Sequence, residues 1–505
     1  MITGPPATAR VLEGGSIIRT RHISRALVFL CTALLALSAP TAADAQEYSE
    51  RREIAVFRLN YYGAPRDPVP AAETVVQLGR VFRLERRVQA ETTEIFQQAV
   101  GAIDEKIRSV FIDMGRFDVI GMGSRLNHEN VDAFVEALRD HRSESIELPD
   151  TVLFGEEAFT KADFDRLTGG FIVVVPSVSF YDLSREVNED GDAGYEARIE
   201  TSFTFIDADT LTTVDQFFVE TSSYDRDPEE AMREAVEAIP PRLSFETRSM
   251  DIFRIRTGIL AVDGRNITLE FGRNMGVRPG DEYAIVRRIR NAAGRSYQEE
   301  TGLIVVQEVR ENFSVGHLIY TDEAPRVGAQ LEEVPRFGVE TTPYGGVITS
   351  AFGPLGSDGS DSGGGNTSVL LGARVTYSRG FSTFRPLVGV EIPIRQLGSG
   401  LFPLNLYAGG ELNWYLGRLK LAPGFGLGVG GGVPLVEADD EFYLSHLGGH
   451  LRASLMYAVS RNSYAFIDLG YAVWLGLAPA GVPASLQDYF AGYNGILISA
   501  GVLLK

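Results

Sequence analysis

A cluster of serine and histidine residues occupies the stretch from Ser445 to Ser454, which also contains His446 and His450. A serine hydroxyl becomes a nucleophile when a histidine base lies within hydrogen-bonding reach and an acid orients that base. The stretch therefore supplies two of the three residue types that such catalysis requires. Which side chains meet depends on the helix or strand that carries them.

A second segment, Asn188–Gly194 (NEDGDAG), offers oxygen ligands at alternate positions, as calcium loops do. A calcium loop of the EF-hand type also requires glycine at its sixth position and glutamate at its twelfth. Ala193 and Ile199 occupy those positions, so the segment is typical of a solvated hairpin turn. The sequence has no phosphate-binding loop and no histidine or cysteine cluster with metal-ligand spacing. We therefore expect no metal, no cofactor and no catalytic residue.

Charged residues also lie inside a long apolar run, His450–Gly476, which reads HLRASLMYAVSRNSYAFIDLGYAVWLG. Apolar residues alternate with small, polar or charged residues on both sides of the SRNS turn. A period of two residues is the signature of a β-strand. Arg452 and Asp468 fall on the mixed polar face of this hairpin, whereas Leu455 falls on the continuous apolar face.

Composition and charge limit the class of protein. The chain has 505 residues and a formal net charge of −20. A surface that binds nucleic acid needs clustered lysine and arginine, so we exclude nucleic acid as a partner. With 23% charged and 44% hydrophobic residues, the composition is typical of a globular chain rather than a disordered one.

The single cysteine, Cys31, lies in a segment that predicts export. Arginines at positions 19, 21 and 25 precede an apolar core, and Ala43 and Ala45 supply the small residues of a cleavage site. This pattern predicts a secretory signal peptide over residues 1–45, too short for a typical membrane span. Later segments lack the roughly 20 unbroken apolar residues of a spanning helix. A closed β-barrel would still satisfy every backbone group in lipid.

Residues 46–250 mix strand-like and helical patterns. EIAVFRL and RFDVIGM read as strands, and helical spacing covers Val88–Met114 and NHENVDAFVEALRDH. A further helix is expected at Glu156–Leu167, followed by long strands and a closing helix that begins near Pro228. This order resembles the α/β domain shared by TolB amino-terminal regions and curli-secretion-channel proteins. The resemblance implies an α/β periplasmic domain.

Residues 251–337 contain short strands separated by glycine turns, which predicts a small β-barrel. The segment GRNMGVRPGDEYAIVR resembles the carboxy-terminal domain of the flagellar assembly T protein. Gly272, Gly276, Gly280 and Asp281 hold the places of its recurring pattern. We expect the glycines to adopt positive φ in tight turns and Asp281 to accept hydrogen bonds in its turn. The resemblance implies two successive periplasmic domains.

Residues 338–505 are rich in glycine, tyrosine, leucine and valine and contain eight strand patterns, joined alternately by long and short connections. This alternation is typical of outer-membrane barrels, and it predicts an eight-stranded antiparallel transmembrane β-barrel. The short turns, at Arg379, Arg418 and Arg461, are expected in the periplasm. The last strand ends in lysine, whereas such barrels typically end in an aromatic residue. A periplasmic aromatic girdle is predicted from the residues before the short turns, Tyr377, Trp414 and Tyr457.

The mixed polar faces of these strands are expected to line the barrel interior. An eight-stranded barrel leaves room only for side chains, and an unpaired buried charge is costly. Arg374 and Arg452 should therefore balance two of the carboxylates. A filled interior predicts an anchor and not a pore. The predicted ionic network of the lumen consists of Arg374, Glu391, Glu411, His450, Arg452 and Asp468.

This inward placement argues against catalysis by the serine and histidine cluster. Eight-stranded outer-membrane lipid hydrolases invite comparison, but they pair serine and histidine on the outer face, close to lipid. Here His446, His450 and Ser454 face inward, and their spacing differs. A soluble β-sandwich is the structural alternative, although it does not explain the alternating loops.

The whole sequence predicts a non-enzymatic outer-membrane protein with its amino-terminal domains in the periplasm. The expected partners are outer-membrane lipid and periplasmic or peptidoglycan-associated proteins. The domain order favours scaffolding or assembly of an envelope complex, flagellar-basal or secretion-associated. A surface adhesin acting through external loops and a component of an oligomeric secretion channel are the alternatives. The sequence leaves the oligomeric state open.

Overall fold

The computed structural model describes residues 49–61, 92–101, 103–126, 130–142, 151–154, 157–161, 172–187, 193–208, 210, 212–290, 295–349, 367–394, 401–434, 443–477 and 493–505. The predicted signal peptide lies outside the described residues, as do positions 188–192 of the calcium-like segment. The described residues all belong to one compact unit. Among them, no helix is long and apolar enough to span a membrane.

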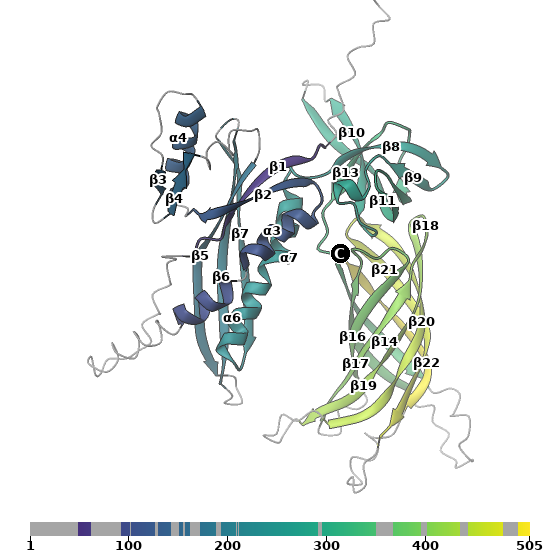
Figure 1. Ribbon diagram of the computed structural model, residues 1–505. Coiled ribbons are helices and arrows are strands. Elements are labelled where there is room, and N and C mark those ends of the chain that lie inside the picture. The colour runs from purple at the N-terminus through teal and green to yellow at the C-terminus, as the bar shows by residue number, and fades with distance from the viewer. Residues whose placement is uncertain are drawn as a thin grey trace, which may run out of the picture. The chain divides into compact units, whose positions relative to one another are not determined.

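A five-stranded mixed sheet forms the amino-terminal part, in the order β2-β1-β5-β6-β7 (Figure 1). The parallel strands are β1 (Arg52–Arg58), β2 (Phe117–Arg125) and β5 (Ile172–Val187). The antiparallel meander continues from β5 through β6 (Ala193–Asp207) to β7 (Thr212–Asp225). The apolar side chains of β1 alternate between two separate clusters, one on each face of the sheet. Such two-sided burial explains the unbroken apolar run in its sequence.

Helices cover both faces of this sheet. Residues 92–100, α3 (Ile103–Asp113), α6 (Pro228–Glu237) and α7 (Ile239–Ser249) contribute to the cluster on one face. α4 (Val131–Arg142) contributes to the cluster on the other face. The amino-terminal part is therefore a layered helix–sheet–helix structure.

Two local expectations differ from the structure. A helix was expected at Glu156–Leu167, but that prediction is wrong for Glu157–Thr160, which form strand β4. This strand pairs with β3 (Thr151–Phe154) in a hairpin. A pattern of four residues does not reveal this cross-strand pairing. The expected closing helix is two helices, α6 and α7. Pro240 and Pro241 lie in the first turn of α7 and lack the N–H groups that would continue α6.

A closed six-stranded barrel follows, in the order β10-β11-β12-β9-β8-β13, and the predicted small β-barrel is confirmed. Its apolar interior includes Ile259, Ile285 and Leu331. The short 3-10 helix η2 (Arg273–Met275) connects β9 to the turn before β10. The strands are β8 (Arg256–Asp263), β9 (Asn266–Leu269), β10 (Glu282–Arg290), β11 (Ser296–Val309), β12 (Ser314–Thr321) and β13 (Gln330–Val334).

The glycines of the turn before β10 serve two different purposes. Gly276 and Gly280 have positive φ, at +74° and +87°, as expected. Gly272 does not, because its φ is −131°. Its backbone approaches another segment so closely that a Cβ would lie 2.3 Å from the carbonyl oxygen of Arg310. Close approach, and not a left-handed conformation, therefore explains this glycine.

The last part of the chain is a closed antiparallel barrel (Figure 1). β18 (Trp414–Leu416) continues β17 (Leu401–Leu412) after Asn413, and β17 also pairs with β19, so eight strands surround the interior. The predicted eight-stranded antiparallel barrel is confirmed. Its other strands are β14 (Val339–Thr349), β15 (Thr367–Tyr377), β16 (Phe384–Pro393), β19 (Leu419–Pro434), β20 (Tyr443–Ser460), β21 (Ser463–Gly476) and β22 (Tyr493–Leu504).

Candidate functional site

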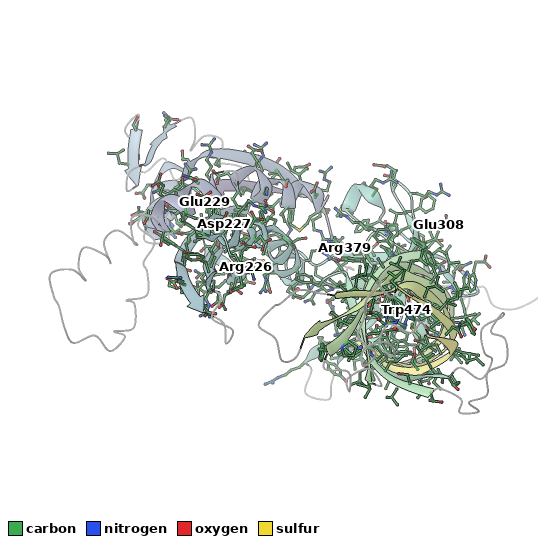
Figure 2. The ribbon with its side chains drawn as sticks, turned by 90° about the horizontal axis from the view of Figure 1, so that it is seen from below. Arg226, Asp227, Glu229, Glu308, Arg379 and Trp474 are labelled. Atoms are coloured by element: carbon green, nitrogen blue, oxygen red, sulfur yellow. The ribbon has the colours of Figure 1, made fainter. Side chains whose placement is uncertain are left out.

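The interior of the eight-stranded barrel contains the charged residues of the mixed polar faces. Side chains on the opposite face are exposed: Leu371 by 52%, Leu455 by 53% and Ile467 by 62%. Figure 2 shows Trp474 within the ring of strands, where it is fully buried. The barrel is therefore apolar outside and ionic inside. At most 4% of the surface is exposed in each of Arg374, Glu391, Glu411, His450, Arg452 and Asp468.

Asp468 lies at the centre of the first lumen layer. Its Oδ2 atom accepts hydrogen bonds from Nη1 of Arg374 and from Oγ of Ser499, both at 3.0 Å. The same oxygen lies 3.9 Å from Nη1 of Arg452. Arg452 also donates through Nη2 to Nε2 of His450, at 2.5 Å. Two arginines thus share one carboxylate in this layer.

Glu391 has a different environment from the one the sequence suggests. Its Oε1 atom accepts a hydrogen bond from the hydroxyl of Tyr344 at 2.7 Å, and that hydroxyl lies 2.9 Å from the hydroxyl of Tyr407. The guanidinium of Arg452 lies over the Tyr407 ring, 5.2 Å from its centroid, within range of a cation–π interaction. Arg452 was expected to pair with a carboxylate of its own. It lies instead against the rings of Tyr344 and Tyr407.

A second lumen layer lies closer to the short turns. Arg385 Nη1 donates to both carboxylate oxygens of Glu340 at 2.9 Å, and Lys420 Nζ lies 3.3 Å from Glu411. Arg385 and Glu340 are both buried in the lumen, although neither was predicted to belong to the lumen network. Arg385 alternates in phase with Glu391 on the same strand. The period of two residues is thus the signal that could have found it.

The predicted girdle residues lie on the outer surface of the barrel. Tyr377, Trp414 and Tyr457 are each 45% to 50% exposed. Each is close in sequence to one of the three short turns that join the barrel strands.

The serine and histidine cluster forms buried structural contacts. Ser454 Oγ accepts a hydrogen bond from Arg374 at 3.3 Å. Ser445 Oγ lies 2.6 Å from Nδ1 of His446, at a point where the register between β19 and β20 shifts. Ser445 and His446 are at most 1% exposed, so a substrate carbonyl has no access to the hydroxyl. Among the described residues, no group of three or more His, Cys, Asp or Glu side chains could hold a metal ion.

The end of this barrel that carries the short turns contacts the six-stranded barrel. Glu282 forms ion pairs with Lys505 and, at 2.9 Å, with Arg336. Arg461, in the third short turn, lies 2.8 Å from Glu300 of β11. One apolar cluster joins the two barrels, and it includes Leu303, Val305, Ile319, Tyr415, Tyr464 and Phe466.

A buried ionic cluster, which we call the junction cluster, links all three parts. It consists of Arg116, Arg248, Asp281, Glu333 and Arg379. Glu333 lies 2.7 Å from both Arg116 and Arg248. Asp281 Oδ1 lies 3.5 Å from Arg248 Nη2 and 3.3 Å from Nε of Arg379, which belongs to the first short turn.

Burial and neighbouring charges shift the pKa of two groups in the junction cluster, Glu333 and Arg379. Burial alone would raise the pKa of Glu333, but the charges of Arg116 and Arg248 outweigh it and hold this pKa well below its ordinary value. Burial and repulsion from Arg248 lower the pKa of Arg379 to about 10, against the opposing attraction of Asp281. Both groups are therefore charged at neutral pH.

Known proteins offer little guidance to this site. No family model and no curated protein sequence match the chain. Neisserial surface protein A is similar in structure, with 16% identity over 33% of this chain and 96% of that chain and a TM-score of 0.23. A designed transmembrane β-barrel is 12% identical over 33% of this chain and 94% of the designed chain, with a TM-score of 0.19. A PelC chain, from a dodecamer of Paraburkholderia phytofirmans, is 11% identical over 39% of this chain and 91% of that chain, with a TM-score of 0.17. At these values, none of the three identifies a function for this chain.

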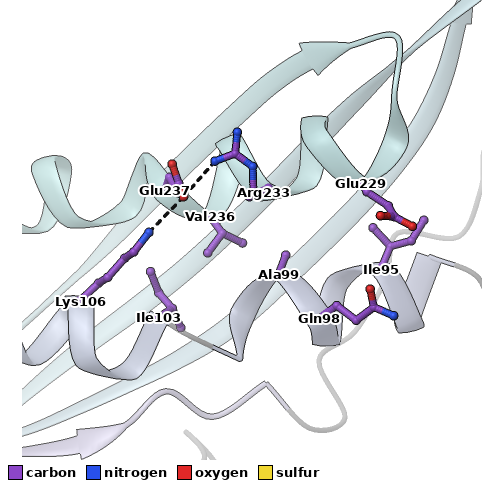
Figure 3. A pocket seen from close by; sticks show the side chains of 9 residues that line it. All are labelled: Ile95, Gln98, Ala99, Ile103, Lys106, Glu229, Arg233, Val236 and Glu237. Carbon is purple, nitrogen blue, oxygen red and sulfur yellow. Dashed lines mark hydrogen bonds and ion pairs between the residues drawn. The ribbon is translucent and has the colours of Figure 1, made fainter.

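A cavity of about 300 Å³ lies between residues 92–100, α3 and α6 (Figure 3). Its apolar lining includes Ile95, Ile103 and Val236. Lys106 and Arg233 at its rim both pair with Glu237, at 3.1 and 3.0 Å. Because both cations already pair with Glu237, we assign no binding function to this cavity between the helices.

Proposed function

We propose that the protein is a non-enzymatic outer-membrane anchor whose amino-terminal parts lie in the periplasm and scaffold an envelope complex. The observation that carries this proposal is the closed eight-stranded barrel with an apolar exterior and a paired ionic interior.

Lipid is the environment that fits the barrel exterior. Leu451 is 67% exposed, Leu469 61% and Leu475 62%, and these side chains alternate along paired strands with buried ones. A contiguous apolar surface of this kind is rare on monomeric soluble proteins. In a membrane barrel the outward-facing residues form an apolar band, and the closed ladder satisfies the backbone.

The interior supports an anchor rather than a channel. The two lumen layers fill it with paired side chains, as expected for eight strands. The apolar cluster shared with the six-stranded barrel covers its short-turn end. A solute would have to break buried ion pairs to pass, which is costly.

The scaffolding role rests on how the parts are joined. Asp281 and Glu282 of the six-stranded barrel hold cations from the α/β part, from the first short turn and from the last strand. Such contacts hold the amino-terminal parts against the membrane anchor, where a partner meets them in a fixed position. The resemblance of GRNMGVRPGDEYAIVR to a flagellar assembly domain makes a flagellar-basal or secretion-associated complex the first class to test.

Cysteine accessibility tests the orientation, because the only native cysteine is Cys31. Single cysteines are placed at Ser360, between β14 and β15 in the sequence, and at Asn312, in the turn between β11 and β12. A membrane-impermeant maleimide should label Ser360→Cys in intact cells and Asn312→Cys only after the outer membrane is permeabilised. Labelling of both in intact cells would overturn the periplasmic placement.

Crosslinking in intact cells, read by mass spectrometry, tests the partner. We expect crosslinks from residues 53–335 to periplasmic or peptidoglycan-associated proteins. Exclusively extracellular partners would favour the adhesin, and a purified complex of many subunits would favour the secretion channel. Loss of a lipid hydrolase activity in Ser454→Ala would contradict the non-enzymatic assignment.

A further inference from the structure

A cleft of about 230 Å³ opens beside the junction cluster. α3 and α7 form its walls, and the turns that carry Arg278 and Arg379 close it from the side of the two barrels. Apolar groups such as Val110 and Pro241 also line it. Its polar lining residues are Ser109, Asp113, Ser244, Arg278 and Arg379.

Cations outnumber the carboxylates available to them at this cleft. Glu333 is occupied by Arg116 and Arg248, so Asp281 is the remaining buried carboxylate of the junction cluster. Asp281 is already shared between Arg248 and Arg379. The guanidinium of Arg278 donates to a backbone carbonyl, that of Asp113, at 2.7 Å. The Arg278 charge therefore has no carboxylate partner among the described residues.

Arg379 also has an unused donor. Its Nη2 atom is buried and makes no hydrogen bond within the described part of the chain. A buried donor without an acceptor destabilises the fold, and more so when the group is charged. Burial, and after it repulsion from Arg248 and Arg278, lower the pKa of Arg379. An anion in the cleft would offset the repulsion among these arginines.

We propose that this cleft binds a phosphate-type oxyanion between Arg278 and Arg379, and that the ligand is the headgroup phosphate of an anionic phospholipid. Arginine presents parallel donors that match phosphate oxygens. The choice of lipid rests on the proposed function, since Arg379 lies two residues after Tyr377 of the predicted girdle, where headgroups would be. The Asp113 carboxylate at the cleft opposes a second negative charge, which favours a phosphodiester over inorganic phosphate.

The test uses the full chain in an uncharged maltoside detergent, with short-chain phosphatidylglycerol and inorganic phosphate as separate probes in calorimetric titrations. Arg278→Gln is the main variant, because its guanidinium holds no carboxylate. Arg461→Gln is the matched control, since it removes a cation from another short turn, where Arg461 pairs with Glu300. Far-UV circular dichroism and heat-dependent gel migration verify folding of each variant.

We expect the wild type and Arg461→Gln to bind phosphatidylglycerol equally, and Arg278→Gln to bind it about tenfold more weakly or worse. Arg379→Gln should weaken binding similarly. Equal binding by Arg278→Gln and Arg461→Gln, or no binding of either probe, would overturn the site. Arg278-dependent binding of inorganic phosphate alone would keep the oxyanion site and overturn the lipid ligand. The maleimide experiment tests the membrane orientation independently of Arg278.

Discussion

Substitution of Gly276 tests whether the α/β part and the six-stranded barrel are held together as the structure indicates. Gly276 has a φ of +74°, and a Cβ built there would lie 1.6 Å from the carbonyl oxygen of Met114 in the α/β part. Gly264 has a φ of +59° but nothing within 4 Å of such a Cβ. Gly264→Ala therefore adds only backbone strain, whereas Gly276→Ala adds strain and an inter-part clash.

The magnitude follows from these distances. A left-handed alanine costs roughly 1–2 kcal/mol, and both variants carry this cost. An ordinary Cβ contact is at least 3.4 Å against 1.6 Å here, so Gly276→Ala must separate the two backbones by nearly 2 Å. The Arg116–Glu333 pair, 2.7 Å long and only two residues from Met114, would then be broken. Breaking a buried pair costs about 3–5 kcal/mol, which should appear in Gly276→Ala alone.

Hydrogen exchange with mass-spectrometric readout measures this difference along the chain. In Gly276→Ala, we expect faster exchange in peptides covering 110–117 and 330–334, on both sides of the contact. Gly264→Ala should change exchange only around its own turn. If the two variants show the same exchange and the same resistance to urea, the close approach of Gly276 to Met114 does not hold the parts together.

Three further predictions concern the ion pairs and the lipid-facing wall. Asp468→Asn leaves Arg374 without its carboxylate and should destabilise the barrel by about 3–5 kcal/mol, measured by urea unfolding in lipid vesicles. Glu333 has a pKa below its ordinary 4.5, so its stabilisation is complete above about pH 4.5 and is lost as the pH falls towards the folded-state value. Urea resistance of the junction should therefore fall in acid, and Glu333→Gln should weaken that dependence, leaving the part that comes from Glu282, whose pKa is also lowered. Leu451→Arg should cost about 2–4 kcal/mol in the bilayer if the residue lies near its midplane. Leu260→Arg, at an exposed site on the six-stranded barrel, should change little.

The sequence pattern predicted the inside and outside of the barrel because a strand's period of two residues is rigid. One residue of slip would move a whole set of side chains to the other face. This is why Arg452 and Asp468 could be assigned to the polar face, and why Arg385 could have been. The same pattern does not fix how far along the barrel axis each side chain reaches. Arg374 and Arg452 therefore meet at Asp468, whereas Glu391 meets Tyr344.

The contacts between the three parts could not be predicted from the sequence. Arg116 and Glu333 are 217 positions apart, and Arg248 and Arg379 are isolated arginines in unrelated segments. Their pairing depends on how folded surfaces dock, for which residue spacing contains no information. From the sequence, Gly276 was predicted only to adopt a positive φ in a tight turn. Its second role, the close approach to Met114, appears only when the two parts are placed together.

Buried arginine–carboxylate pairs occur at both the lumen and the junction, and the same physical reason accounts for both. In a membrane barrel the exterior is apolar, so an apolar interior would leave two similar faces and a weakly determined register. Buried ions remove that ambiguity, because only one register gives each charge a partner, and an unpaired one is strongly penalised. At the junction, Asp281 and Glu333 act in the same way on the docking of whole parts. We infer that these charges select one arrangement rather than add net stability, as the proposed scaffolding role would require.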